Sequence, residues 1–167
     1  MSKNGNLTIV LQAGGESRRM GRSKATVPFL GEPLLWRGIN RLMPLADEFL
    51  ITTNEPQNLS FLDDLIDLGK VRLVTDDYEQ RGALRGVYTA INAASLEFVA
   101  LVACDMIFPS RNLIAAELEA VISNGADIAV PEGGATYVSA VNGMAAGEYR
   151  ISPADEGSLP ENARRIK

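Results

Sequence analysis

The segment 11–24 has the residue types needed to bind an anion, because it combines neighbouring glycines with arginine and lysine. It reads Leu-Gln-Ala-Gly-Gly-Glu-Ser-Arg-Arg-Met-Gly-Arg-Ser-Lys and follows a short apolar run. Glycines let backbone N–H groups approach phosphate oxygens, and cationic side chains neutralise the phosphate charge. The whole chain carries a net charge of −5. Local basicity in an acidic chain predicts an anion site; the alternative is an ordinary glycine turn followed by a solvated basic segment.

Asp105 is the second candidate for chemistry. It follows residues 98–103, the most apolar run in the chain, which predicts a buried strand. In an open parallel sheet, ligands bind beyond the carboxyl ends of the strands. Mg²⁺ is commonly held by one or two carboxylates together with substrate phosphates. We therefore predict that Asp105 is a metal ligand; the alternative is that it caps a helix beginning near Ser110.

The composition excludes several kinds of catalytic site. The chain has no histidine, so it cannot by itself build a Ser-His-Asp triad, a histidine-ligated zinc site or an imidazole general base. Its single cysteine, Cys104, cannot form an intramolecular disulfide and is interpreted as a small buried residue and not as a nucleophile. The chemistry must then use carboxylates, Lys, Arg, backbone amides or a hard metal ion.

Charge and hydropathy also limit the expected partners and location. The 16 Lys and Arg residues against 21 Asp and Glu residues argue against general binding to nucleic acid or to anionic membranes. The first residues show no secretory signal pattern, and no run reaches the roughly 20 apolar residues of a membrane span. We predict a cytoplasmic protein that binds neither nucleic acid nor membranes.

Alternating apolar patterns predict the elements that position these residues. The expected strands are residues 7–11, 49–53, 71–74, 98–103 and 127–130. The expected helices begin with one at about Pro33 and continue with 59–68, 84–94 and 111–123. Because strands alternate with helices, the expected fold class is α/β, a three-layer α/β/α Rossmann-like domain with a mostly parallel sheet. The crevice at the carboxyl ends of its strands then receives the loop after residue 11.

At 167 residues the chain is expected to form a single domain, residues 1–167. Glycine and proline interrupt every pattern from Pro131 onward, so we expect a weakly ordered tail from about residue 151. Residues 137–141 are interpreted as a strand that pairs with an edge of its own sheet or with a second chain. The expected state is therefore a monomer or a weak homo-oligomer.

Three motifs occur in the order of a known family. The first comprises Ala13-Gly14-Gly15, Arg19-Met20-Gly21 and Lys24, followed by Gly31-Glu32-Pro33-Leu34. The second is Asp76 followed by Gly-Ala-Leu-Arg-Gly at 82–86, and the third is Ala-Cys-Asp-Met-Ile-Phe-Pro at 103–109. Together they resemble the signature of the molybdenum cofactor guanylyltransferases, nucleotidyltransferases with a GT-A-like Rossmann fold. Gln12, Ala83 and residues 106–108 depart from that family's pattern.

The resemblance implies an activity. It implies transfer of GMP from GTP to the phosphate of molybdopterin with release of pyrophosphate, a step of molybdenum cofactor biosynthesis, with Mg²⁺ as cofactor. GTP and molybdopterin are then the small-molecule substrates of this chain. The alternatives are a cytidylyltransferase, a sugar-phosphate nucleotidyltransferase, and a truncated, non-catalytic nucleotide-binding relative.

The resemblance also implies site residues. In the expected catalytic set, Lys24 touches the α-phosphate, Arg19 touches the outer phosphates and Asp105 holds Mg²⁺. The expected nucleotide-binding residues are Leu11, Ala13, Gly14, Gly15, Lys24, Asn54, Asp76 and Asp105. Asn54 ends a predicted strand, where it could read a base edge or form a turn. The acceptor is an ionised phosphate, so no strong general base is needed and the lack of histidine is no obstacle.

Overall fold

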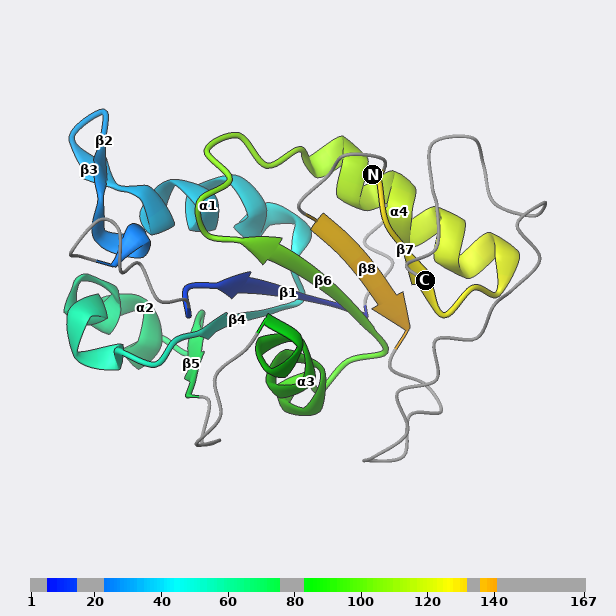
Figure 1. Ribbon diagram of the computed structural model, residues 1–167, viewed down its shortest axis with the longest axis horizontal. Helices are drawn as coiled ribbons and strands as arrows, with labels where there is room; N and C mark the ends of the chain where they lie inside the picture. The colour runs from blue at the N-terminus through cyan, green and yellow to red at the C-terminus, as the bar shows by residue number, and fades with distance from the viewer. Residues whose placement is uncertain (1–5, 15–22, 76–82, 132–135, 141–167) are drawn as a thin grey trace.

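A six-stranded sheet runs through the middle of the molecule (Figure 1), in the order β5-β4-β1-β6-β8-β7. The structure is a computed structural model that describes residues 6–14, 23–75, 83–131 and 136–140. The strands of the sheet are β1 (Leu7–Gln12), β4 (Glu48–Thr52), β5 (Arg72–Val74), β6 (Phe98–Ala103), β7 (Ile128–Ala129) and β8 (Thr136–Ala140). Every predicted strand is present within one or two residues of its expected bounds.

The sheet is mostly parallel, as predicted. The pairs β5–β4, β4–β1 and β1–β6 are all parallel, whereas β8 runs antiparallel to both β6 and β7. The predicted strand at 137–141 is thus confirmed as β8, and of its two expected partners it takes its own sheet. It lies between β6 and β7, with Phe98 opposite Ala140 and Ile128 opposite Ser139.

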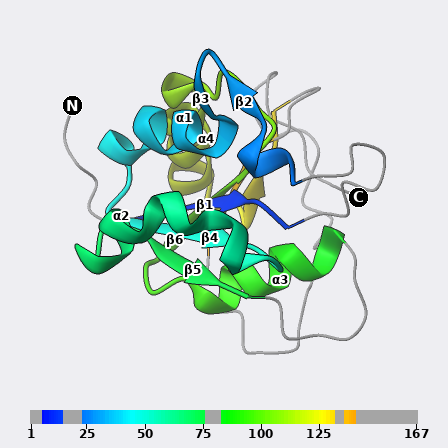
Figure 2. The ribbon, with the colours of Figure 1, turned by 90° about the vertical axis from the view of Figure 1, so that its left-hand side faces the viewer.

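Helices cover both faces of the sheet. Figure 2 shows α1 (Leu34–Leu42) and α4 (Arg111–Asn124) on one side and α3 (Ala83–Ala93) on the other. The three-layer α/β/α class is therefore confirmed. The remaining elements are a hairpin of β2 (Pro28–Phe29) and β3 (Glu32–Pro33), the short helix α2 (Asp63–Asp67), and the 3₁₀ turns η1 (Lys24–Thr26), η2 (Met43–Leu45) and η3 (Pro56–Leu62). Within the described ranges, no helix combines the length and apolar character needed to cross a bilayer.

The predicted α-helix at 59–68 is wrong in its first half. Residues 56–62 form the 3₁₀ segment η3, and only Asp63–Asp67 is α-helical. Leu59 has φ −113° and ψ 22°, outside the helical region. The kink at Leu59 divides this segment into two short turns, so the α-helix begins only at Asp63. Leu59 and Leu62 are both buried and lie just before this start.

Two apolar clusters hold the layers together, one on each face of the sheet. Alternate residues of β1 divide between them: Ile9 and Leu11 join the first cluster, and Val10 joins the second. The first cluster also takes Phe49, Ile51, Ala100 and Val102 from the strands and Leu35, Ile39, Leu42, Ile114, Leu118 and Val121 from α1 and α4. The second takes Leu50, Val99 and Leu101 from the strands and Ala90 and Ile91 from α3.

The amino-terminal edge of the sheet is fastened by Glu48. Its carboxylate accepts hydrogen bonds from the Thr8 hydroxyl at 2.6 Å, from Arg72 at 2.9 Å and from the Ser95 backbone N–H at 2.9 Å. Partial burial raises the pKa of the Glu48 carboxyl, but these hydrogen bonds outweigh it and leave the pKa below its ordinary value. The carboxylate therefore ties β4 to β1, to β5 and to the segment after α3.

Candidate functional site

The carboxyl ends of four strands lie level with one another. Gln12, the last residue of β1, pairs with Thr52 on one side and Ala103 on the other, and Thr52 pairs with Val74. The ladder continues for one residue past this row, because the Ala13 N–H donates to the Thr52 carbonyl oxygen at 2.8 Å. The loops after these strands therefore begin at the same height above the sheet, as the topology of a parallel sheet requires for a ligand site.

Three predicted site residues stand two positions beyond this row. They are Gly14 after β1, Asn54 after β4 and Asp105 after β6. A Cβ added to Gly14 would lie 3.8 Å from Asn54 Nδ2 and 3.9 Å from the Thr52 carbonyl oxygen. The Gly14 backbone is exposed and runs beside the loop after β4, so its side-chain-free surface borders the Asn54 amide.

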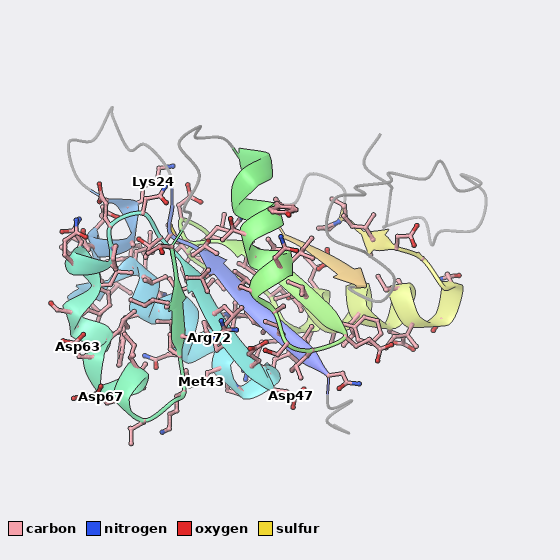
Figure 3. The ribbon with its side chains drawn as sticks, turned by 90° about the horizontal axis from the view of Figure 1, so that it is seen from below. Lys24, Met43, Asp47, Asp63, Asp67 and Arg72 are labelled. Carbon is pink, nitrogen blue, oxygen red and sulfur yellow. The ribbon has the colours of Figure 1, made fainter. Side chains whose placement is uncertain are left out.

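Lys24 and Asp105 meet at this edge of the sheet. Lys24 Nζ donates to Asp105 Oδ2 at 2.7 Å across 81 residues of sequence, and both side chains are 46% exposed. The hydrogen bond to Asp105 and the negative charge of its carboxylate raise the pKa of Lys24 above its ordinary value. Figure 3 shows Lys24 at the end where β1 finishes, with Asp47 at the opposite end. The edge therefore carries a solvent-accessible cation in contact with a solvent-accessible carboxylate.

Local packing fixes the segment that carries Lys24. Its neighbour Ala25 is completely buried in the first apolar cluster. The Val27 N–H donates to the Lys24 carbonyl oxygen at 3.3 Å, which closes the η1 turn. The Leu34 N–H then donates to the Val27 carbonyl oxygen at 2.9 Å, so the turn is joined to the start of α1. A buried alanine and a short helix thus aim the lysine at the sheet edge.

The segment that carries Asp105 is also held at both ends. The Cys104 N–H donates to the Gln12 carbonyl oxygen at 3.1 Å, and the Met106 N–H closes a turn on the Ala103 carbonyl oxygen at 3.1 Å. Ser110, not Asp105, is the N-cap of α4, because its hydroxyl accepts from the Leu113 N–H at 3.3 Å. The alternative interpretation of Asp105 as a helix cap is therefore wrong.

Cys104 has the environment expected for a packing residue. Burial, followed by the nearby charge of Asp105, raises the pKa of the Cys104 thiol to about 11. A thiol with that pKa is almost wholly protonated at neutral pH and is a poor nucleophile. Cys104 is only partly buried, packed against the first apolar cluster, which supports its interpretation as a small packing residue and not as a nucleophile.

The other predicted site residues divide into two groups. The Leu11 side chain is 1% exposed and lies in the first apolar cluster, so only the Leu11 backbone faces the ligand edge. Ala13 is half-buried at that edge. Gly15, Arg19 and Asp76 lie outside the described residues, as does the tail expected from residue 151. The nucleotide-binding roles of all these residues stay predictions.

Gln12, the last residue of β1, also lies at this edge. The sequence indicates no site role for it and shows only that it departs from the family motif. A Cβ added to Gly86, in the first turn of α3, would lie 3.3 Å from Gln12 Nε2. The Gln12 carboxamide therefore lies over a glycine of α3, on the side of the sheet opposite the Leu11 side chain. The signal that could have found it is a polar residue directly after an apolar strand.

Asp105 is the residue here that could hold a metal. Among the described residues no three His, Cys, Asp or Glu side chains gather closely enough to bind a metal ion by themselves. A single exposed carboxylate is a suitable ligand for Mg²⁺ when substrate phosphates complete the coordination. The donor set thus fits a metal that is bound together with its phosphate ligand.

Comparisons with known proteins point to one family. The family described as MobA-like NTP transferase domain matches residues 9–156. The chain is 30% identical over 128 residues to a protein of Natranaerobius thermophilus named probable molybdenum cofactor guanylyltransferase. The aligned residues cover 75% of this chain and 60% of that protein. The chain is 33% identical over 131 residues to the molybdenum cofactor guanylyltransferase of Shewanella amazonensis, covering 77% of the chain and 63% of that protein. The chain thus spans about three fifths of the length of these relatives.

Solved structures support the fold. The crystal structure of molybdopterin-guanine dinucleotide biosynthesis protein A from Archaeoglobus fulgidus superposes with a TM-score of 0.60 at 18% identity, over 79% of this chain and 67% of that one. At this identity the likeness shows a common α/β fold.

Proposed function

Because the chain belongs to the family of MobA-like NTP transferase domains, we propose that it transfers GMP from GTP to the phosphate of molybdopterin and releases pyrophosphate. The names of the curated relatives support this choice of nucleotide and acceptor. The observation that carries the proposal is the 2.7 Å contact between Lys24 and Asp105, at the edge where Gly14 also lies.

Lys24 has the charge and exposure that the transfer requires. An acceptor phosphate oxygen attacks the α-phosphorus in line, a new P–O bond forms, and the bond to the bridging oxygen of the β-phosphate breaks. Negative charge then grows on the non-bridging α-phosphate oxygens and on pyrophosphate. A lysine ammonium group is charged at neutral pH at its ordinary pKa of about 10.4, and the contact with Asp105 raises the pKa of Lys24 further. With its side chain 46% exposed, it can donate to an α-phosphate oxygen.

The remaining roles are distributed over the same edge. The proposal gives Asp105 the role of holding Mg²⁺, which when bound would neutralise phosphate charge. The exposed Gly14 backbone and the adjacent Asn54 amide would contact the nucleotide. Arg19, outside the described residues, would bind the outer phosphates. No general base is assigned, because the acceptor phosphate is already ionised near neutral pH.

The test is a transfer assay with the purified chain. GTP or CTP labelled at the α-phosphate is incubated with molybdopterin and Mg²⁺, and both the labelled dinucleotide and pyrophosphate are measured. Omission of molybdopterin is the control for simple hydrolysis. We expect label transfer from GTP in the presence of the acceptor only, with one pyrophosphate released per dinucleotide formed.

Other results separate the alternatives. Transfer from CTP and not from GTP would make the chain a cytidylyltransferase. Stabilisation of the chain by GTP in a thermal unfolding assay, without any transfer, would indicate a non-catalytic nucleotide-binding protein. If no nucleotide stabilises the chain and none is transferred, the proposal is contradicted, because the site then binds no nucleotide.

A further inference from the structure

An arginine of α1 lies between two phenylalanines from different segments of the chain. The Arg37 guanidinium carbon is 5.1 Å from the Phe29 ring centroid and 5.2 Å from the Phe108 ring centroid. The two rings meet edge to face, with centroids 6.1 Å apart and an interplanar angle of 84°. Each contact is within the range of a cation–π interaction. We refer to these three residues as the Phe29–Arg37–Phe108 cluster.

The cluster connects the two segments that carry Lys24 and Asp105. Phe29 lies in β2, five residues after Lys24, and Phe108 lies three residues after Asp105. One turn further along α1, Arg41 Nε donates to the Pro109 carbonyl oxygen at 2.5 Å. Helix α1 therefore contacts the loop after β6 through two arginine side chains, and one of them also contacts the hairpin.

A short segment with hydrogen-bonded turns joins each ring to the site. On one side, η1 leads directly into the β2–β3 hairpin, in which Phe29 pairs with Glu32. On the other side, the Met106 N–H bond to the Ala103 carbonyl oxygen closes the turn that contains Asp105. Each ring therefore lies within five residues of the charged side chain, on a segment whose turn is closed by hydrogen bonds.

Core packing does not explain the position of Phe108. Its side chain is 61% exposed, among the most exposed large apolar residues described. The Lys24–Asp105 ion pair is also too exposed to fix two segments 81 residues apart on its own. The loop after β6 is held against α1 by the buried Pro109, which accepts the hydrogen bond from Arg41, and by the contacts of Phe108 with Arg37. Of these, the Arg37 contacts also reach Phe29 in the hairpin that follows Lys24.

We infer that the Phe29–Arg37–Phe108 cluster sets the spacing between Lys24 and Asp105, which makes Arg37 a positioning residue for nucleotidyl transfer. The inference depends on the proposed function, because the spacing matters only where these two side chains act on one substrate. A displacement of about 1 Å in a catalytic group can lower a rate by roughly two orders of magnitude. Loss of the cluster is therefore expected to lower kcat more than it raises KM for GTP.

The experiment compares three cluster variants with a matched control. Arg37→Met keeps an unbranched side chain but removes the charge, Phe108→Ala removes one ring, and Arg37→Lys keeps a cation over the rings. The control is Phe61→Ala. Phe61 lies outside the cluster and packs edge to face on Trp36, the neighbour of Arg37 in α1, with ring centroids 6.5 Å apart. The readouts are kcat, KM for GTP, the melting temperature and hydrogen–deuterium exchange at the Met106 amide.

We expect Arg37→Met and Phe108→Ala to lower kcat about 10- to 100-fold while KM for GTP changes less than about threefold. The Met106 amide should exchange faster in both variants, and Arg37→Lys should recover most of the rate. Phe61→Ala should lower the melting temperature without changing kcat or Met106 exchange. An Arg37→Met variant that behaves like Phe61→Ala would overturn the inference.

Failure of the proposed function would be seen separately. If the parent chain transfers no nucleotide, the proposed function fails, and Met106 exchange alone then decides whether the cluster holds the Asp105 loop. Faster exchange in Arg37→Met would support that role, and unchanged exchange would refute it.

Discussion

Replacement of Lys24 by alanine should separate the activity of this chain from its stability. The lost interaction is one ion pair, with Nζ 2.7 Å from Asp105 Oδ2 and both side chains 46% exposed. Ion pairs with this exposure contribute about 0–1 kcal/mol to folding. In a domain of this size, 1 kcal/mol corresponds to roughly 2–4 °C in melting temperature. Lys24→Ala should therefore lower the melting temperature by no more than about 4 °C.

The expected effect on transfer is much larger. In the proposed transition state, Lys24 donates to an α-phosphate oxygen whose charge is growing. Removal of one such preorganised donor costs about 2.7–4 kcal/mol, or about 10²–10³ in kcat. The loss in rate should therefore exceed by far what the loss in stability could produce, since nearly all of the protein stays folded at 25 °C.

The control for this assay is an exposed lysine that lies far from the site. Lys70, which follows the turn after α2, is exposed, and Lys70→Ala removes the same atoms far from the sheet edge. Both variants are assayed for GMP transfer at saturating GTP and for thermal unfolding. A Lys24→Ala rate within about threefold of that of Lys70→Ala would refute the catalytic role. A fall in melting temperature well beyond 4 °C would show that Lys24 acts mainly in folding.

Three other substitutions give shorter predictions. Asp105→Asn should weaken the Mg²⁺ dependence of transfer and leave metal-free GTP binding nearly intact, as measured by an Mg²⁺ titration and by calorimetry. The pKa of Glu48 is lowered by folding, so its carboxylate adds stability above the ordinary pKa of about 4.3, and this stability is lost as the pH falls through the folded value. Glu48→Gln should thus be less stable than the parent at pH 7, with a smaller difference at pH 3 in urea unfolding. Ser110→Ala removes the N-cap of α4 and should lower the free energy of unfolding by about 1 kcal/mol.

The location of the site could be predicted because it depends on local signals and a topological rule. Apolar runs marked β1, β4 and β6, and parallel strands place their carboxyl ends at one edge. Gly14, Asn54 and Asp105 each follow such a run by a few residues, so their convergence could be inferred before any distance was known. Residue types then indicated an anion and a metal.

Other features depend on contacts between distant segments and left no local signal. Nothing in residues 136–140 indicates that they pair between β6 and β7, because that choice depends on which strand edges are available. The hairpin between β2 and β3 turns through Leu30, whose φ is +53°, and Gly31, whose φ is +87°. Asparagine or aspartate, and not leucine, is the usual partner of glycine in such a turn. Because the turn lacks the usual sequence signal, the hairpin that contains Phe29 could not be predicted from the sequence.

The contact between Lys24 and Asp105 is also a long-range feature, and its weakness suits the proposed chemistry. Separating a buried ion pair costs several kcal/mol of free energy, which either partner would have to overcome before it could bind a substrate. This pair is half exposed, so separating it costs about 1 kcal/mol or less. In the proposed complex, Lys24 would exchange the Asp105 carboxylate for a phosphate oxygen, while Asp105 would exchange the ammonium group for a metal ion. Both exchanges replace one opposite-charge contact with another, so neither charged side chain would be left unpaired while the substrate binds.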